Sequence, residues 1–277
     1  MSRPGCRPVR VAQDPRPSDP SLQMARSVGM SAAERQIFAY SGMISTAPNR
    51  SSNFDLTTHA LTLATPRDRP RLCYVPTAVG DSQTAVDAKQ AIFRELRPDV
   101  EFSVLTLFTQ PSVPDIRGHL LAQDVILVEG GSVVNLMAVW RAHGLPAILR
   151  ECWETGVVLS GASAGSLCWH IGGPTDSYRD ALDPFVEGLG LLPFSNGVHD
   201  DFTDQPRRSA YRSLIAAGGL PAGYASEDGV GLHYVDAELR QAVTVRDGAS
   251  AWWVEADARS GYTERAIEAT LLASGGS

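Results

Sequence analysis

One short stretch, Val157–Trp169, constrains the fold of this chain more than any other part of it. It begins with an apolar run, continues into Gly161-Ala-Ser-Ala-Gly165, and leads into a segment compatible with a helix. A buried strand that turns sharply into a helix, with a serine at the turn, is the layout of a nucleophile elbow. The two glycines have a steric reason there, because residues two positions from the serine approach other backbone closely. The stretch therefore predicts an exposed, nucleophilic Ser163.

The pentapeptide alone is a weak signal in a chain with 25 glycines, where an ordinary turn also explains it. The apolar run before it and the small residues Ala162, Ala164 and Ser166 favour the elbow. The start of the following helix presents free N–H groups and the positive end of the helix dipole, which suit an oxyanion beside the serine. The N–H of Ala164 is then the first expected oxyanion donor.

A second backbone feature, Gly130-Gly131, follows the apolar run Val125–Val128 and precedes a helix-like segment. Two glycines at the end of a strand can direct an N–H into the same site, where it would be the second oxyanion donor. An ordinary strand-to-helix turn explains the pair equally well. The Gly-Gly-Ser sequence is too short for a dinucleotide or phosphate-loop fingerprint, so neither kind of nucleotide site is expected.

The composition excludes several classes of protein. With 277 residues, 43% hydrophobic and 20% charged, the chain is ordinary for a soluble globular protein. A net charge of −7 argues against a nucleic-acid partner, which would require a basic face. No apolar run approaches the ~18 residues of a membrane span, and the N-terminus lacks the apolar core of a secretory signal. We therefore expect a cytoplasmic protein without a membrane partner. The four cysteines and six histidines form no cluster at metal-ligand spacing, so no metal or organic cofactor is expected.

Strand-like and helix-like segments alternate through the first half of the chain. Expected strands cover residues 37–40, 72–75, 100–107, 125–128 and 157–159, and expected helices cover 82–96, 146–155 and a segment ending at Trp140. This alternation predicts an α/β fold with a mostly parallel sheet and helices on both faces. Beyond the elbow, we expect a polar loop at 172–183, a helix at 206–217, and strands near 222–225, 230–235, 242–245 and 251–254.

The chain divides into one domain and two flanking segments. Residues 1–34 are rich in Pro, Arg and Ser and predict a disordered extension. A start site assigned too early is the alternative, since Met24 and Met30 both precede the first strand-like segment. Residues 35–260 are expected to form a single α/β domain, and residues 261–277 a tail with the character of a frayed helix.

A nucleophilic serine requires a general base, and the base requires an orienting carboxylate. Among the six histidines, His199 differs from the others: it follows Gly-Val and precedes two acids, past an apolar segment, where loops carry catalytic groups. Two carboxylates are candidates for the acid. Glu227 ends a short strand-like segment, and Asp176 lies in the expected loop after the elbow. A solvated loop carboxylate is the alternative interpretation of either.

Several motifs occur together in a definite order along the chain. They are Val128-Glu-Gly-Gly-Ser-Val-Val-Asn-Leu136, Trp140-Arg-Ala-His-Gly-Leu145, Gly161-Ala-Ser-Ala-Gly-Ser-Leu-Cys-Trp169, Gly188-Leu-Gly-Leu-Leu192, His199-Asp-Asp-Phe202, Arg207-Arg208 and Ser226-Glu-Asp228. In this order the chain resembles the peptidase E (aspartyl dipeptidase) and cyanophycinase family of serine peptidases, over about residues 36–255. The resemblance implies a class I glutamine-amidotransferase-like three-layer sandwich whose nucleophile elbow carries Ser instead of Cys.

The resemblance also implies roles for individual residues. Ser163 would be the nucleophile and His199 the general base. Cyanophycinase-like members place a Glu where Glu227 stands, whereas peptidase E-like members are described with an Asp near Asp176 or Asp180; Glu227 is favoured. The family's glycine motif usually has three glycines, and Glu129 here replaces the first. The oxyanion donors are then expected at Gly131 and Ala164.

An aspartyl dipeptidase must bind a substrate carboxylate, for which arginine is the natural partner. Arg207 and Arg208 lie near where the family's recognition arginine falls, and Arg179 is a further option; a solvated helix start also explains the pair. We thus expect a serine peptidase, monomeric or homodimeric, that hydrolyses dipeptides or tripeptides with an N-terminal Asp.

Three other functions compete with this expectation. One is a cyanophycinase-like or isoaspartyl-directed peptidase with the same triad, and another is a catalytically silent binding protein on the same fold. An α/β-hydrolase esterase is less favoured, because that fold orders its triad Ser, acid, His.

Overall fold

The computed structural model describes residues 34–42 and 50–273. The disordered extension predicted for residues 1–34 therefore lies outside the described residues, except for residue 34 itself. The described residues belong to one compact unit. No helix within them is long and apolar enough to cross a membrane.

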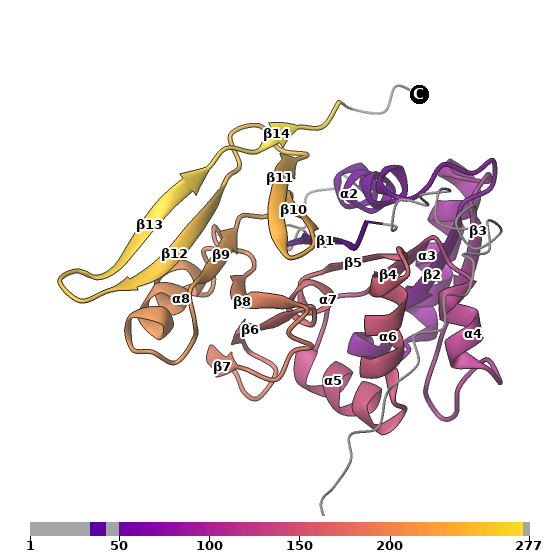
Figure 1. The fold of residues 1–277 in the computed structure, drawn as a ribbon, viewed down its shortest axis with the longest axis horizontal. Coiled ribbons are helices and arrows are strands. Elements are labelled where there is room, and N and C mark those ends of the chain that lie inside the picture. Colours follow the sequence, from indigo (N-terminus) through magenta and orange to yellow (C-terminus); the bar gives the residue numbers. More distant parts are fainter. Residues whose placement is uncertain (1–33, 43–49, 274–277) are drawn as a thin grey trace, which may run out of the picture. The chain divides into compact units, whose positions relative to one another are not determined.

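A parallel sheet forms the centre of the fold (Figure 1). Its strands, in spatial order, are β1 (Gln36–Tyr40), β5 (Val158–Ala162), β4 (Val125–Val128), β2 (Arg71–Val75) and β3 (Glu101–Val104). All neighbouring pairs among these five run parallel. The other side of β1 pairs antiparallel with β10 (Val230–Val235). Beyond β10, the sheet continues with β11 (Glu238–Thr244) and β14 (Thr270–Leu271). The predicted α/β class with a mostly parallel sheet is confirmed.

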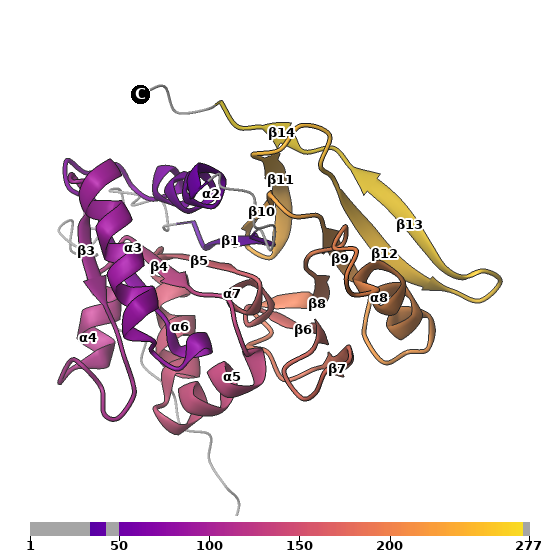
Figure 2. The ribbon, with the colours of Figure 1, turned by 180° about the vertical axis from the view of Figure 1, so that it is seen from behind.

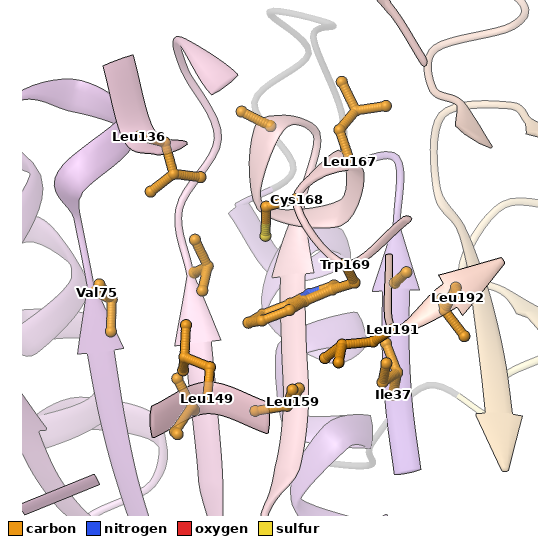
Figure 3. Close-up of a cluster of buried hydrophobic side chains, with 14 of the residues drawn as sticks. Ile37, Val75, Leu136, Leu149, Leu159, Leu167, Cys168, Trp169, Leu191 and Leu192 are labelled. Atoms are coloured by element: carbon orange, nitrogen blue, oxygen red, sulfur yellow. The ribbon is translucent and has the colours of Figure 1, made fainter. Parts of the chain in front are cut away.

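Helices cover both faces of this sheet, because successive residues of each buried strand point to opposite faces. Phe38, Tyr74 and Leu127 pack in one cluster with residues of α2 (Arg50–Leu63) and α3 (Gln83–Leu96). Ile37 and Val75 lie in the opposite cluster, which Figure 3 shows. That cluster is completed by residues of α4 (Ile116–Leu121), α5 (Val133–Ala142), α6 (Leu145–Glu154) and the short α7 (Ala164–Leu167). Figure 2 shows α3 in front of the sheet, on the face opposite α5 and α6.

A second sheet, which the sequence analysis did not foresee, follows the elbow. Its strands, in spatial order, are β13 (Gly261–Ile267), β12 (Ala251–Asp257), β9 (Gly223–Ser226), β8 (Leu192–Gly197), β6 (His170–Thr175) and β7 (Asp183–Phe185). Helix α8 (Arg207–Ala216) packs against it through Tyr211 and Ile215, which cluster with Val254. Leu192 and Phe194 of β8 instead join the core of the parallel sheet.

Two expectations beyond the elbow are corrected. The polar segment 172–183 is not all loop, since its first residues belong to β6. The tail after Gly261 is not a frayed helix: its residues form β13 and pair with β12 along the whole length of that strand. The aromatic and β-branched residues Trp252, Tyr262 and Thr263 suit paired strands, and the hairpin partner satisfies backbone groups that a frayed helix end would expose to water.

Candidate active site

The nucleophile elbow joins β5 to α7 with Ser163 at the turn. Ser163 has φ 52° and ψ −112°, a conformation that L-residues rarely adopt. Its N–H donates to the carbonyl of Tyr40 on the neighbouring strand at 3.0 Å. A Cβ at Gly161 would lie 2.4 Å from the carbonyl oxygen of Gly165, and one at Gly165 would lie 2.3 Å from that of Val128. The steric role predicted for both glycines is confirmed.

Ser163 begins a continuous chain of hydrogen bonds. Its Oγ lies 2.9 Å from Nε2 of His199, and Nδ1 of His199 lies 2.5 Å from Oδ1 of Asp228. An ionised Asp228 accepts from Nδ1–H, so the bare Nε2 accepts from the serine hydroxyl. His199 is 4% exposed and Asp228 7%, which excludes most of the water that would compete for these bonds. The arrangement is that of a serine nucleophile, a base and an orienting acid.

The acid of this chain is a correction to the sequence analysis. Glu227, the favoured residue, turns away from His199 and accepts from the N–H of Ser250 at 2.9 Å. Asp176, the alternative, pairs with Arg207 at 3.0 Å. Glu227 and Asp228 share one tight turn between β9 and β10, and consecutive residues of such a turn point in different directions. The sequence pattern predicted the correct turn, but the side-chain directions within that turn bring Asp228, and not Glu227, to His199.

Two residues hold the backbone of Asp228, and the sequence analysis assigned a role to neither. Asp201 Oδ1 accepts from the N–H of Asp228 at 2.8 Å. Arg246 Nε donates to the carbonyl of Asp228 at 3.2 Å, and its Nη2 pairs with the other oxygen of Asp201. Both peptide groups that flank the Asp228 side chain are thus fixed from outside. The two acids that directly follow His199 in the sequence could have pointed to Asp201. No local sequence pattern pointed to Arg246.

The backbone of His199 is also held. Its φ of 58° lies in the left-handed region, which is uncommon for residues other than glycine. Its N–H donates to Oγ of Ser41 at 3.2 Å, and that hydroxyl lies 2.8 Å from the carbonyl oxygen of Ser226. Ser41 is fully buried. It directly follows β1, so the central sheet positions the base as well as the nucleophile.

The glycine pair after β4 lies against Ser163. A Cβ at Gly130 would lie 3.2 Å from Cβ of Ser163. Gly131 has φ 134°, and a Cβ there would lie 2.4 Å from the carbonyl oxygen of Ala78, so only glycine fits. Between residues 50 and 273, the N–H groups of Gly131 and Ala164 donate to no acceptor. Both predicted oxyanion donors therefore have an uncommitted N–H.

The two predicted recognition arginines differ in their surroundings. Arg207 is 7% exposed; its Nη2 bonds to Asp176, while its buried Nε has no partner among the described residues. Burial lowers the pKa of Arg207 below its ordinary value. Arg208 is committed to structure, since it pairs with Asp200 at 2.7 Å and with Glu264 at 3.0 Å. Arg179, the further option, pairs with Asp183 on the surface.

A cavity of about 470 Å³ is lined by residues of the segment that follows His199 and of helix α8. Its lining includes Asp200, Phe202, Arg207 and Arg208, whereas neither Ser163 nor His199 contributes to it. It therefore lies along the segment that follows His199, with Arg207 on its wall. Within residues 34–42 and 50–273, no group of three His, Cys, Asp or Glu side chains is placed to hold a metal ion.

Known proteins resemble this chain in sequence and in fold. The family model of peptidase family S51 matches residues 40–242. The chain belongs to peptidase family S51. The uncharacterized peptidase YgaJ of Bacillus subtilis (strain 168) is 42% identical over 188 residues, which are 68% of this chain and 79% of YgaJ. Family membership makes this protein a serine peptidase, as the resemblance implied.

Two crystal structures share the fold of this S51 peptidase. One is a candidate peptidase E from Listeria monocytogenes EGD-e, with a TM-score of 0.53 and 17% identity over 77% of this chain and 99% of that one. The other is a peptidase from an acI-B1 actinobacterium, with a TM-score of 0.57 and 16% identity over 86% and 96% of the two chains. At such identities the likeness concerns the fold alone. The expected class I glutamine-amidotransferase-like architecture is confirmed.

Proposed function

We propose that this S51 peptidase removes an N-terminal Asp from dipeptides and tripeptides through a triad of Ser163, His199 and Asp228. The unbroken chain of hydrogen bonds from Ser163 Oγ to Asp228 Oδ1 carries the proposal. A serine that is hydrogen-bonded to a buried, oriented imidazole can transfer its proton as it attacks a carbonyl.

The reaction proceeds in two halves. Ser163 Oγ attacks the scissile carbonyl while Nε2 of His199 takes the hydroxyl proton, and Asp228 stabilises the imidazolium that forms. The oxyanion accepts hydrogen bonds from the N–H groups of Gly131 and Ala164. The imidazolium then protonates the leaving amine, and an acyl-enzyme remains on Ser163. Water, deprotonated by His199, attacks the acyl-enzyme and releases the N-terminal residue.

Arg207 is the residue proposed to select an acidic substrate. It is the more suitable of the two adjacent arginines, since Arg208 already pairs with two carboxylates, those of Asp200 and Glu264. Asp176 holds one nitrogen of Arg207 and thereby fixes the guanidinium plane. A substrate carboxylate would bind the remaining N–H groups from the side of the cavity, after a small movement that uncovers Nε.

A cyanophycinase-like or isoaspartyl-directed peptidase is the second candidate. One observation favours it: the acid comes from the turn after β9, where cyanophycinase-like members carry theirs, and not from the loop after the elbow. The chemistry of Ser163 would be unchanged, while the substrate would present its aspartyl residue through the side-chain carbonyl.

Hydrolysis of a peptide panel tests both candidates. The panel contains Asp-X, Asn-X, Glu-X and β-aspartyl dipeptides and the matching p-nitroanilides, with Ser163→Ala as the control. Preferred cleavage of Asp-X that the control lacks supports the proposal. Preferred cleavage of β-aspartyl peptides favours the second candidate. Binding of acidic peptides without any cleavage would contradict both and favour a silent binding protein.

A further inference from the structure

Glu129 stands at the end of β4, directly before the glycine pair of the proposed oxyanion hole. Its Oε2 accepts from the hydroxyl of Tyr74 at 2.6 Å and lies 3.1 Å from Nζ of Lys89. Its Oε1 accepts from the N–H of Gly130 at 3.2 Å. Three donors from β2, α3 and the glycine pair thus converge on one carboxylate, and one of them, Gly130, lies against Ser163. The proposed mechanism uses none of them.

The protonation states of this cluster are consistent with its hydrogen bonds. Burial raises the pKa of the Glu129 carboxyl, but Lys89, Tyr74 and the Gly130 N–H together lower it further, so its pKa lies below the ordinary value. Burial raises the pKa of Tyr74, and the negative charge of Glu129 raises it further. The tyrosine therefore stays protonated, and its hydroxyl donates a hydrogen bond to the carboxylate. Lys89 also lies over the Tyr74 ring, 5.3 Å from its centroid.

The bond from Gly130 determines which N–H remains for the substrate. With the Gly130 N–H occupied by Glu129, the next N–H along the chain, that of Gly131, is the uncommitted one. On the far side, the N–H of Ser132 donates to the carbonyl of Ala78 at 2.9 Å. The loop is therefore tied down on both sides of Gly131, and an oxyanion hole requires such fixed donors.

The charge of Glu129 requires compensation at this position. A bare carboxylate close to the oxyanion would oppose the negative charge that develops in the transition state. Lys89 supplies the compensation, and both side chains are only partly exposed, at 22% for Lys89 and 25% for Glu129, which limits screening by solvent.

We propose that Glu129 is a positioning residue of the oxyanion hole: held by Tyr74 and neutralised by Lys89, it occupies the Gly130 N–H and directs the N–H of Gly131 to the reacting carbonyl. The inference rests on the proposed function, in that Ser163 attacks a carbonyl there. Glu129 itself touches no reacting atom.

A set of variants tests this role in the full-length protein. Kinetics with the best substrate of the panel are measured for Glu129→Ala, Glu129→Gln, Lys89→Met and the double variant Glu129→Gln/Lys89→Met. Each variant is also titrated with a peptide boronic acid, which forms a tetrahedral adduct on Ser163. Labelling of Ser163 by a fluorophosphonate provides a readout that needs no peptide substrate, and thermal unfolding verifies that each variant is folded.

The positioning role predicts a distinct pattern. Glu129→Ala should lower kcat by about tenfold, less than complete loss of an oxyanion donor, and should weaken boronic acid binding by the same factor while KM stays within about twofold. Lys89→Met alone should also lower kcat. The double variant should recover most of it, because the Gln oxygen still accepts from Gly130 and no charge is left unbalanced. If Glu129→Ala is unfolded, the Lys89 series alone decides.

Several outcomes would overturn the inference. Unchanged kinetics in Glu129→Ala, or a double variant as impaired as Lys89→Met, would remove Glu129 from the oxyanion hole. A loss confined to substrates with a free amine, with N-acetylated ones unaffected, would assign Glu129 to the substrate ammonium instead. A wild type that reacts with the fluorophosphonate but cleaves no peptide contradicts the proposed function alone, and labelling rates then test Glu129. A wild type inert to both contradicts both.

Discussion

At the scale of the residue, the site depends on side-chain directions within short turns. Glu227 and Asp228 are neighbours, yet only Asp228 reaches His199, because Asp201 and Arg246 hold both of its peptide groups. The carboxylate of Glu227 instead accepts a hydrogen bond from the N–H of Ser250. The two acids therefore form a matched pair of variants with the same charge change and almost the same position.

Replacement of the two acids should give opposite results. Asp228→Asn is expected to lower kcat by about 10⁴-fold, because an amide stabilises the wrong tautomer of His199 and cannot support the imidazolium. Glu227→Gln should stay within about threefold of wild type, since it weakens only the hydrogen bond from Ser250 and a 3.7 Å ion pair with Arg246, which keeps its bonds to Asp201 and Asp228. Steady-state kinetics on one Asp-X substrate compare the two. Equal losses in both variants would remove the distinction between them.

The adjacent arginines form a second matched pair. Arg207→Ala should reduce the preference for Asp-X over Asn-X by roughly 10- to 100-fold, the equivalent of ~1.5–3 kcal/mol for a hydrogen bond to a charged group. Arg208→Ala should leave the preference intact and cost about 1 kcal/mol of stability, as expected for a half-exposed ion pair. The ratio of kcat/KM values for the two substrates decides. A preference unchanged in Arg207→Ala would exclude that residue from substrate recognition.

At the scale of the element, the hairpin of β12 and β13 is tied to the loop that carries His199. Arg212 of α8 pairs with Asp200 at 2.6 Å and with Glu264 of β13 at 2.7 Å. Arg212 is 2% exposed and Asp200 3%, so their charges are compensated inside the protein. Strand β13, far from His199 in sequence, thereby supports the segment beside this proposed general base.

Loss of this buried pair should be costly. Asp200→Ala is expected to lower the free energy of unfolding by ~3–5 kcal/mol, because it removes the buried partner of Arg212 and leaves only the more exposed Glu264 to compensate its charge. Glu264→Ala, whose carboxylate is 31% exposed, should cost only about 1 kcal/mol. Urea denaturation of both variants measures the difference. A smaller cost for Asp200→Ala than for Glu264→Ala would contradict the role of Asp200 as the buried partner.

At the scale of the whole domain, the residues of the proposed triad lie where the two sheets meet. Ser163 follows β5 of the parallel sheet, His199 follows β8 of the second sheet, and Asp228 lies in the turn that leads from β9 to β10. The core between the sheets contains His170, whose ring centroid is 5.7 Å from those of Phe194 and Tyr234. His170 is fully buried, and its Nδ1 lies 2.9 Å from the carbonyl oxygen of Ser166 in α7.

The burial of His170 should make stability depend on pH. Burial lowers the pKa of His170 from 6.5 to about 4. Between pH 6.5 and pH 4, this histidine is therefore protonated in the unfolded chain but neutral in the folded one. Stability therefore falls as the pH falls through this window. From pH 7.5 to pH 5 this one group should remove about 2 kcal/mol. Urea denaturation across this range measures it, and His170→Phe should flatten that part of the curve. An unchanged slope in the variant would assign the effect elsewhere.

Sequence patterns alone determined the local features of this protein. The apolar runs of β1, β2, β4 and β5 were recognisable because a strand buried on both faces is continuously hydrophobic. The elbow was recognisable because Gly161 and Gly165 flank Ser163 within five residues, directly after an apolar run. These patterns fit within short windows of the chain, although the backbone that excludes side chains at Gly165 and Gly131 belongs to Val128 and Ala78, far away in the sequence.

Tertiary structure alone decided the features that depend on distant partners. Helix α2 mixes polar with apolar residues in sequence, and only the burial of Leu56 and Ala60 against the sheet makes it a helix of the core. Strand β13 takes its conformation from pairing with β12. The selection of Asp228 over Glu227 depends on Arg246, 18 residues further along the chain. In each case the deciding interaction joins groups that the sequence separates, and the folded chain brings them together.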